Sequence, residues 1–447
     1  MKIKHVHFEK LFGFFDYSVD FHDAVTIIHG PNGCGKTTML RIIDATFNQR
    51  MDELKATDFQ YVEFLFSDGV TLKIERKKAL LDRTDSEGGY IVYLAYTIGG
   101  IGQSRVFDSF ENTDEYITVM RKIVKGSRLL PWLSRQTEDS WYDRKNEQVL
   151  TTEEVIAKYG NMIYRRFGSE LFEEEVPTEV RTVLREIDVR LIAADRLTVS
   201  TKREDRHYGE EPIKIERKVD IIADDLAKRI RETIQKYAQL AQARDRTFPF
   251  RAIKQKSLKS VEEIKAKMIE LETKRKQFIE TGILEEEKDN IDIYQLVEAI
   301  TDSDRQNLSL YISDTAEKLD ALSNLSSSIN LFRKLIDGSF NNKKIKFSKE
   351  YGFRFVTTYS NSEILPQNLS SGEQHELVMF YDLIFNTSDK TLILIDEPEL
   401  SLHIKWQLGY VDELLEIISL TGFSAVLATH SPQIIHDKWG LTVSLSD

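Results

Sequence analysis

The segment Gly30-Pro31-Asn32-Gly33-Cys34-Gly35-Lys36-Thr37 decides the fold of this chain. An apolar run at 25–28 precedes it, and a helical pattern over 38–47 follows it. Strand, glycine-rich turn and helix N-terminus are the context that a phosphate-binding loop requires. The glycines allow consecutive backbone N–H groups to curl around a phosphate, where the helix dipole adds positive potential. We therefore expect Lys36 to reach the β- and γ-phosphates of a nucleotide and the Thr37 hydroxyl to contact Mg²⁺.

Length and composition predict a protein of two or three domains with a buried core. The chain has 447 residues, and its hydrophobic content of 41% is ordinary for a soluble protein. No segment approaches the roughly 18 uninterrupted apolar residues of a membrane span, and residues 1–8 alternate like a strand instead of forming a signal peptide's apolar block. We therefore expect a cytoplasmic protein that does not contact a membrane.

Cysteine content and charge exclude further classes. Cys34 is the only cysteine, so neither an intramolecular disulfide nor a multi-cysteine zinc site can form. The formal net charge of −12 argues against binding nucleic acid over the whole surface, although it allows a local basic patch.

Strand patterns dominate the first part of the chain and helical patterns the middle. Strands are expected at 2–8, 17–21, 25–29, 61–66, 70–74, 90–98 and 189–194, while 108–185 allows no clear division. From about 214 to 337 the chain is nearly free of Gly and Pro, and apolar residues recur at helical spacing, as at Ile264, Met268 and Leu271. Strand patterns then resume. We expect two lobes of one domain, 1–213 and 341–447, separated by a helical insertion at 214–340.

Leu369-Ser370-Ser371-Gly372-Glu373-Gln374 opens another predicted helix. Ser370 is a favourable N-cap residue, and Gly372 permits close approach of an anion to the backbone. By itself this segment indicates only a capped helix, and its value comes from the motifs that follow it.

Two apolar runs near the C-terminus end in polar residues. The run at 391–395 ends in Asp396 and Glu397, the arrangement of a Walker B motif. There the first carboxylate holds Mg²⁺, usually through water, and the second polarises the attacking water. The run at 424–428 ends at Thr429 and His430. Because α/β sheets place ligand chemistry at the carboxyl ends of parallel strands, we expect His430 to sense the γ-phosphate.

These four motifs resemble those of the ATP-binding-cassette superfamily, in the branch shared by Rad50, SMC, RecF and OLD-type ATPases. The resemblance covers 1–75 and 346–435 well and 189–197 less closely. It implies an α/β fold, namely a P-loop NTPase head of the ABC type with an antiparallel β lobe and a helical, short coiled-coil-like insertion. It also implies hydrolysis of ATP to ADP and phosphate, with ATP and Mg²⁺ as cofactors.

The resemblance gives each motif a role. Residues 30–37 would form the Walker A loop, 369–374 the signature motif and 399–403 the D-loop. Glu397 and His430 are then the expected catalytic residues, and Thr37 and Asp396 the expected metal ligands. The expected nucleotide-binding residues are Gly30, Pro31, Asn32, Gly33, Cys34, Gly35, Lys36, Thr37, Thr38, Ser370, Ser371, Gly372 and Glu373. In a head-to-head homodimer, or a multiple of it, Ser370 and Gly372 would contact the γ-phosphate of ATP held by the other subunit.

The chain departs from the family pattern at three positions. Ser371 replaces the first glycine of the signature motif, His403 occupies the aspartate position of the D-loop, and Asp195 stands where the Q-loop glutamine is usual. Slow or regulated hydrolysis is therefore as compatible with the sequence as fast turnover.

The helical insertion carries a basic cluster with two interpretations. Its members are Arg251, Lys254, Lys256, Lys259, Lys265, Lys267, Lys274, Arg275 and Lys276. They could follow a phosphate backbone. However, Glu262, Glu263, Glu270, Glu272 and Glu280 alternate with them, which is typical of a solvated helix face with i,i+4 pairs.

We expect no effector centre in this chain, because the Toprim domain of OLD-type nucleases is not seen after His430 and no other nuclease, protease or hydrolase constellation is visible. The chain resembles the stand-alone ATPase subunits of bacterial anti-phage systems, of the Septu type with an HNH nuclease or the PARIS type with a Toprim effector. That resemblance rests on size and on the opening Leu11-Phe12-Gly13-Phe14-Phe15-Asp16-Tyr17. It implies a sensor or scaffold that controls a separate nuclease or toxin. The alternative is a RecF- or Rad50-like DNA-repair ATPase acting directly on DNA, and an ABC transporter subunit is a distant third.

Overall fold

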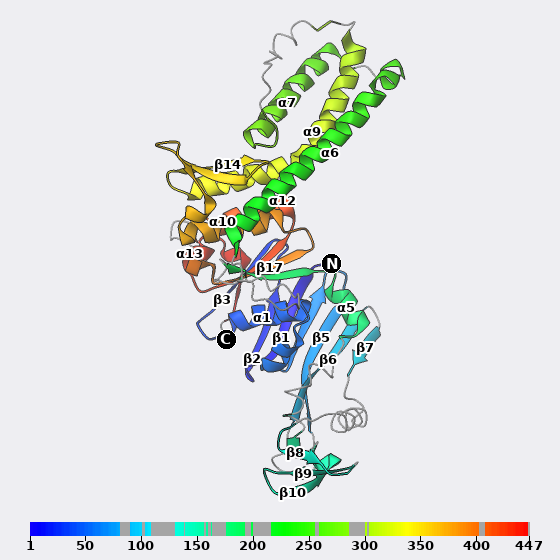
Figure 1. The fold of residues 1–447 in the computed structure, drawn as a ribbon, viewed down its shortest axis with the longest axis vertical. Helices are drawn as coiled ribbons and strands as arrows, with labels where there is room; N and C mark the ends of the chain where they lie inside the picture. Colours follow the sequence, from blue (N-terminus) through cyan, green and yellow to red (C-terminus); the bar gives the residue numbers. More distant parts are fainter. Residues whose placement is uncertain are drawn as a thin grey trace. The chain divides into compact units, whose positions relative to one another are not determined.

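The structure is a computed structural model, and Figure 1 shows its fold. It describes residues 1–80, 90–100, 103–108, 130–137, 139–155, 158–159, 162, 176–192, 198–199, 216–254, 259–285, 300–301, 304–401 and 407–445. The chain forms two compact units. The first contains Met1–Ile192, Asp389–Pro398 and Phe423–Asp447, and the second contains Ala193–Ser388 and Glu399–Gly422.

A five-stranded parallel sheet forms the nucleotide-binding half of the first unit. Its strands are β11 (Asp188–Ile192), β17 (Thr391–Asp396), β18 (Ser424–Thr429), β3 (Val25–His29) and β19 (Thr442–Ser444), in that order across the sheet. β17, β18 and β3 are almost wholly buried, which explains why each reads as an uninterrupted apolar run in the sequence. Their carboxyl ends therefore lie along one edge of the sheet.

A six-stranded antiparallel sheet forms the other half of this unit. It has the order β2 (Phe15–Asp20), β1 (Ile3–Leu11), β4 (Tyr61–Phe66), β5 (Thr71–Leu80), β6 (Tyr90–Gly100) and β7 (Gln103–Phe107). Buried and partly exposed residues alternate along β4, as expected for a sheet with one face on the core. Ser67, Asp68 and Gly69 make the turn between β4 and β5, and Gly69 has a positive φ.

The helix α1 (Lys36–Phe47) packs on the parallel sheet and reaches the antiparallel sheet as well. It contacts β11, β17 and β18, and the Phe47 ring meets the rings of Phe64 and Phe66 edge to face. One hydrophobic core therefore joins α1 to both sheets. The short helices α2 (Met51–Ala56) and α5 (Thr178–Leu184) lie in the same unit. So does a small antiparallel sheet of β8 (Leu133–Arg135), β9 (Ser140–Asp143) and β10 (Gln148–Thr151).

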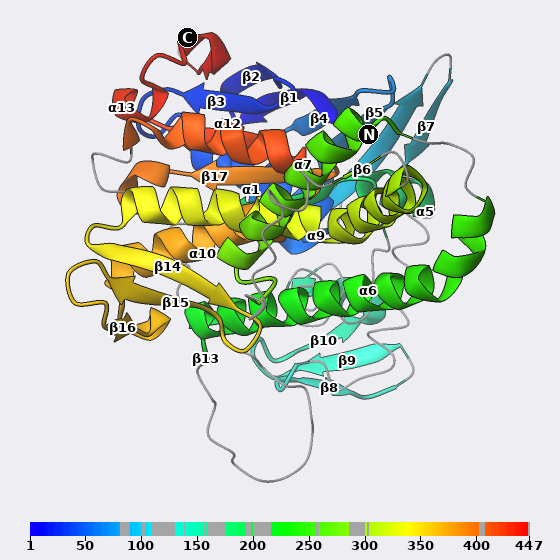
Figure 2. The same cartoon turned by 90° about the horizontal axis from the view of Figure 1, so that it is seen from above.

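The second unit is mainly helical. It contains α6 (Lys218–Lys254), α7 (Val261–Glu280), α9 (Arg305–Ser339), α10 (Ser371–Phe385) and α12 (Tyr410–Thr421). A sheet of β14 (Lys343–Ser348), β15 (Gly352–Thr357) and β16 (Glu363–Ile364) completes it, together with the strand pair β12 (Thr198–Val199) and β13 (Glu216–Arg217). α6 and α7 both pack on α9, and Figure 1 shows α6 and α9 side by side. Figure 2 shows β14, β15 and β16 together at one end of α6, where β15 contacts this helix.

A partly buried polar network fastens the first turns of α6 to α10. The Tyr381 hydroxyl donates to Asp225 at 2.6 Å, and Arg229 donates to the same carboxylate and to the Phe385 carbonyl, at 2.7 and 2.9 Å. Burial alone would raise the pKa of Asp225, but the hydrogen bonds from Tyr381 and Arg229 outweigh it and hold that pKa below its usual value. We call α6, α7 and α9, which pack together, the helical arm. Because Asp225 and Arg229 lie near the start of α6, this network fixes the base of the arm to α10.

The predicted strands and the helical insertion correspond to elements of the structure, and α9 ends at Ser339, next to the predicted border at 340. The border at 213 lies outside the described residues. The two compact units cut across the division into 1–213, 214–340 and 341–447, which stays a prediction. Of the helices in the described part of the chain, none is long and apolar enough to cross a membrane.

Candidate functional site

The loop at 30–35 connects β3 to α1 at the carboxyl edge of the parallel sheet. Gly33 and Gly35 adopt φ angles of 84° and 92°, a region that glycine enters without steric cost. A Cβ on Gly35 would lie 2.9 Å from Leu11 Cδ2 and 3.2 Å from Phe12 Cε2. The end of β1 and the turn that follows it therefore pack against the loop, and a side chain at position 35 would have to displace the Leu11 side chain.

The loop offers donors for an anion. Within the described part of the chain, the backbone N–H groups at 33 and 35–37 donate to no acceptor. The Lys36 side chain is only 6% exposed, and its Nζ donates to the carbonyls of Gly30 and Pro31 at 2.8 and 2.9 Å. Free N–H groups at a helix N-terminus beside an inward-turned lysine are the donor set that a nucleotide's phosphates require.

Thr37 and Asp396 lie together although 359 positions separate them in the sequence. The Thr37 hydroxyl donates to Asp396 Oδ1 at 3.0 Å, which joins the first turn of α1 to the end of β17. Hydroxyl and carboxylate oxygens are the ligands that Mg²⁺ prefers. These two residues thus fit the predicted Mg²⁺ site, where the ion would neutralise charge on the phosphates.

Glu397 and His430 extend from the ends of two neighbouring strands, β17 and β18. The Glu397 backbone has a φ of 47°, which is uncommon for a residue with a side chain, and its N–H donates to Ala428 O at 2.9 Å. His430 Nδ1 lies 4.0 Å from Glu397 Oε1, too far for a hydrogen bond. Both side chains are partly exposed, so water can reach the carboxylate.

The predicted signature residues form the N-terminus of α10 in the second unit. Ser370 and Glu373 make a capping box, in which the Ser370 hydroxyl accepts from the Glu373 N–H and the Glu373 carboxylate accepts from the Ser370 N–H. The Lys343 ammonium also donates to Glu373. Burial acts to raise the pKa of Glu373, but the bonds from Lys343 and Ser370 outweigh burial, so the pKa is lowered and the carboxylate stays charged. Ser370 and Ser371 are exposed, and a side chain at Gly372 would meet open space.

A buried carboxyl group follows one turn later on α10. Glu376 is 2% exposed, and neither of its carboxylate oxygens bonds a described residue, although the Ser339 side chain on α9 is a neighbour. Burial raises the pKa of Glu376 to about 8, and the negative charges of Glu413 and Glu373 add to that rise. Glu376 is therefore mostly protonated at neutral pH.

This raised pKa predicts a pH-dependent stability. A carboxyl group with a higher pKa in the folded state stabilises the fold below the unfolded value of 4.5, and the contribution is lost as the pH rises towards about 8. Glu376→Gln cannot ionise, so we expect it to be about 1–3 kcal/mol more stable than the parent at pH 8.5 and similar at pH 5.5. Thermal unfolding followed by circular dichroism across this range would test it, with the exposed Glu280→Gln as the control. Parallel pH profiles for parent and Glu376→Gln would contradict it.

Two aromatic residues beside the loop were not predicted as site residues. Phe12 touches the Gly35 position, and Phe14 on the same turn is 69% exposed. The Phe12 N–H donates to Asp58 O at 2.8 Å, which fixes the turn. A planar ring next to a phosphate loop can stack on a nucleotide base. The sequence feature that could have indicated them is Gly13 between two phenylalanines, ahead of the phosphate loop.

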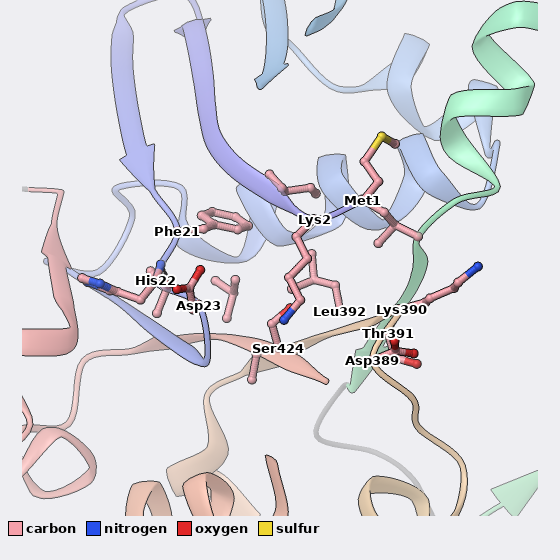
Figure 3. Close-up of a pocket in the computed structure, with 15 residues that line it drawn as sticks. Met1, Lys2, Phe21, His22, Asp23, Asp389, Lys390, Thr391, Leu392 and Ser424 are labelled. Atoms are coloured by element: carbon pink, nitrogen blue, oxygen red, sulfur yellow. Dashed lines mark hydrogen bonds between the residues drawn. The ribbon is translucent and has the colours of Figure 1, made fainter. Parts of the chain in front are cut away.

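Two other predicted positions, Asp195 and His403, lie outside the described residues. A cavity of about 10 Å³ lies at the opposite edge of the parallel sheet, at the amino ends of β17 and β18, where Thr391 and Ser424 line it (Figure 3). That volume suffices for about one water molecule, so this cavity is no alternative site for a nucleotide.

The match to a protein family identifies the broad class of this protein. A model of the AAA ATPase domain matches residues 1–435. The chain belongs to the AAA ATPase domain family. This AAA ATPase therefore has the predicted α/β P-loop NTPase fold, and ATPase activity is its enzymatic function.

Two further comparisons add little. Among curated proteins, no sequence matches this AAA ATPase significantly. Among solved structures, it is similar to the Smc head domain with an extended coiled coil bound to the C-terminal domain of ScpA, derived from Pyrococcus furiosus. The identity is 11% and the TM-score 0.34, over 97% of this chain and 90% of the other. A similarity at this level says nothing about function.

Proposed function

We propose that this AAA ATPase binds ATP with Mg²⁺ at the carboxyl edge of the parallel sheet. The observation that carries this is the convergence of Lys36, Thr37 and Asp396 around a loop whose N–H groups are free to bind phosphate. Residues 30–38 hold the phosphates, Thr37 and Asp396 hold Mg²⁺, and Phe12 or Phe14 stacks on the base. Titration with a fluorescent ATP analogue tests this, and loss of affinity in Phe12→Ala and Phe14→Ala would distinguish base stacking from phosphate binding.

In the proposed reaction, Glu397 accepts the proton of the attacking water while His430 donates a hydrogen bond to the γ-phosphate. Glu397 is suited to this role because its carboxylate stands at a strand end beside His430 and remains accessible to water. Bound Mg²⁺ would neutralise phosphate charge. Lys36 compensates charge that develops on the phosphates, and the fixed loop orients them.

We further propose that two copies of the chain share each ATP site head to head. The exposed N-terminus of α10, with its free space at Gly372, is a suitable donor surface for the γ-phosphate bound by the other copy. The Glu373–Lys343 pair holds this helix end in place.

Subunit mixing tests the shared site. Ser370→Arg alone should lose activity, because its bulk and charge block the helix end, and Lys36→Ala alone should lose nucleotide binding. Mixed one to one, they should recover roughly one quarter of parental ATPase activity, since half of randomly formed dimers are mixed and each has one intact site. Ser362→Arg, an exposed substitution on the β15–β16 turn, is the control. An inactive mixture, or full activity of Ser370→Arg alone, would contradict sharing.

The ATPase cycle is proposed to control a separate nuclease or toxin effector in anti-phage defence. The resemblance to stand-alone defence ATPases supports this proposal. Affinity purification of the full-length chain from its native host tests it. A stoichiometric HNH or Toprim protein would support effector control, whereas recovery with DNA alone would favour a DNA-repair ATPase.

A further inference from the structure

Ion pairs neutralise several basic residues of the helical arm. Between α6 and α9, Arg251 forms a bidentate pair with Asp314, Arg244 pairs with Glu317, and Lys318 pairs with Asp245. On α7, Glu270 lies 2.6 Å from Lys267 and 3.6 Å from Lys274. These cations therefore serve the packing of the arm. The two pairs on α7 are the pairs within a helix that the solvated-face interpretation of the basic cluster expects.

The distal end of α6 is firmly held. Arg251 also donates to the Arg244 carbonyl at 2.8 Å, and Gln306 of α9 donates to the Ala252 carbonyl at 2.8 Å. Arg305 of α9 donates to the Lys259 carbonyl at 2.9 Å, just before α7 begins. The last two turns of α6 are thus joined to α9 by hydrogen bonds and an ion pair.

Four residues form the outward face of this helix end, at spacings of four, three and one: Arg246, Phe250, Ile253 and Lys254, here called the α6 stripe. Phe250 is 73% exposed and Ile253 83% exposed. Arg246 and Lys254 form no ion pair with any residue that the structure describes. Two large apolar side chains held in solvent between two cations indicate a binding surface.

We propose that the α6 stripe binds single-stranded nucleic acid. Although the whole chain is acidic, residues 244–276 contain eleven Lys and Arg against five Asp and Glu. Glu317 and Asp314 of α9 neutralise two of these cations, and the remaining excess leaves this end of the arm locally basic. Arg246 and Lys254 stand one turn to either side of Phe250, about 12 Å apart along the helix. This places an aromatic ring for a base between two cations for the flanking phosphates. The role is independent of effector control and of the ATP site.

Other occupants fit the α6 stripe less well. A second copy of the stripe would bring Arg246 and Lys254 against like charges across a two-fold axis. Double-stranded DNA keeps its bases stacked, so Phe250 would find no free base. A protein with an acidic surface would match Arg246 and Lys254, but such a partner would not explain why the Phe250 ring is exposed between them.

Fluorescence anisotropy with a labelled 30-nucleotide oligo(dT), on the full-length protein at 50 and 200 mM KCl, tests this proposal. Phe250→Ala should weaken binding about tenfold. Arg246→Ala/Lys254→Ala should weaken it at least as much and reduce the slope of log K against log salt by about 2. Matched controls are Tyr359→Ala, an exposed aromatic residue elsewhere in the second unit, and Lys228→Ala, an exposed lysine at the base of α6.

The proposal is overturned if the parent protein does not bind the oligonucleotide, or if both stripe variants bind it as the parent does. Equal affinity for a 30-base-pair duplex, with no effect of Phe250→Ala, would overturn it too. If the stripe variants instead lose a protein partner or self-association by mass photometry while oligonucleotide binding is unchanged, the surface serves protein contacts. Parental basal ATPase activity and melting temperature in each variant show that the fold is intact.

Discussion

Lys36→Ala is expected to abolish ATP binding. The Lys36 ammonium lies inside the phosphate loop, held by the carbonyls of Gly30 and Pro31. In the proposed complex it exchanges these carbonyls for the β- and γ-phosphates, whose charge no other lysine or arginine of the loop can balance. Its removal should weaken ATP affinity at least 100-fold, about 3 kcal/mol, and reduce hydrolysis below detection.

The measurement is titration of a fluorescent ATP analogue, with calorimetry of ATP itself as a second readout. Lys4→Ala removes a half-exposed lysine, paired with Asp23 in the same unit, and is the matched control. Since Lys36 is largely buried, the melting temperature of each variant must be compared without nucleotide, so that lost binding is not mistaken for lost folding. Normal ATP affinity in a folded Lys36→Ala protein would show that the loop at 30–37 is not the phosphate site.

Glu397→Gln should separate binding from hydrolysis. Glutamine has nearly the same shape, so the backbone of residue 397 and its bond to Ala428 O can be kept. It cannot accept the proton of the attacking water. We expect ATP affinity to stay within about threefold of the parent, while kcat falls about 10²- to 10⁴-fold, the usual contribution of a general base.

Two readouts make this prediction specific. Rapid-quench measurement of phosphate release reports the chemical step, and mass photometry with ATP should reveal an accumulated dimer that the parent forms only transiently. Glu63→Gln, on the strand β4, is the control because it lies away from the carboxyl edge of the parallel sheet. Hydrolysis at the parental rate in Glu397→Gln would assign the proton acceptor to another group.

The parts of the fold that the sequence predicted are those with strong local patterns. β17 and β18 are continuous apolar runs because both of their faces are buried, and the capped helix α10 has its box residues three positions apart. β19 was not predicted, because three residues are too few to show a pattern. The same holds for β8–β10, whose strands have three or four residues each.

Side-chain contacts between segments that are distant in the sequence could not be predicted either. The motifs named Thr37 and Asp396 separately, but only the fold shows their hydrogen bond. Lys343 carried no signal at all, since its partner Glu373 lies 30 positions away on another element. In the helical arm the sequence selected the wrong cation. Arg251 belonged to the predicted basic cluster, but Asp314 neutralises its charge. Arg246, which lies outside that cluster, is exposed.

The position of β3 has a consequence for biosynthesis. This strand, which ends at His29 immediately before the phosphate loop, pairs with β18 and β19, and among the described strands it pairs with none made earlier. At about 5–20 residues per second, a ribosome needs roughly 20–80 s to travel from residue 29 to residue 424. Throughout that interval neither edge of β3 has a partner strand to pair with. The nascent loop must therefore wait, protected by α1 or by a chaperone, until β18 and β19 have emerged.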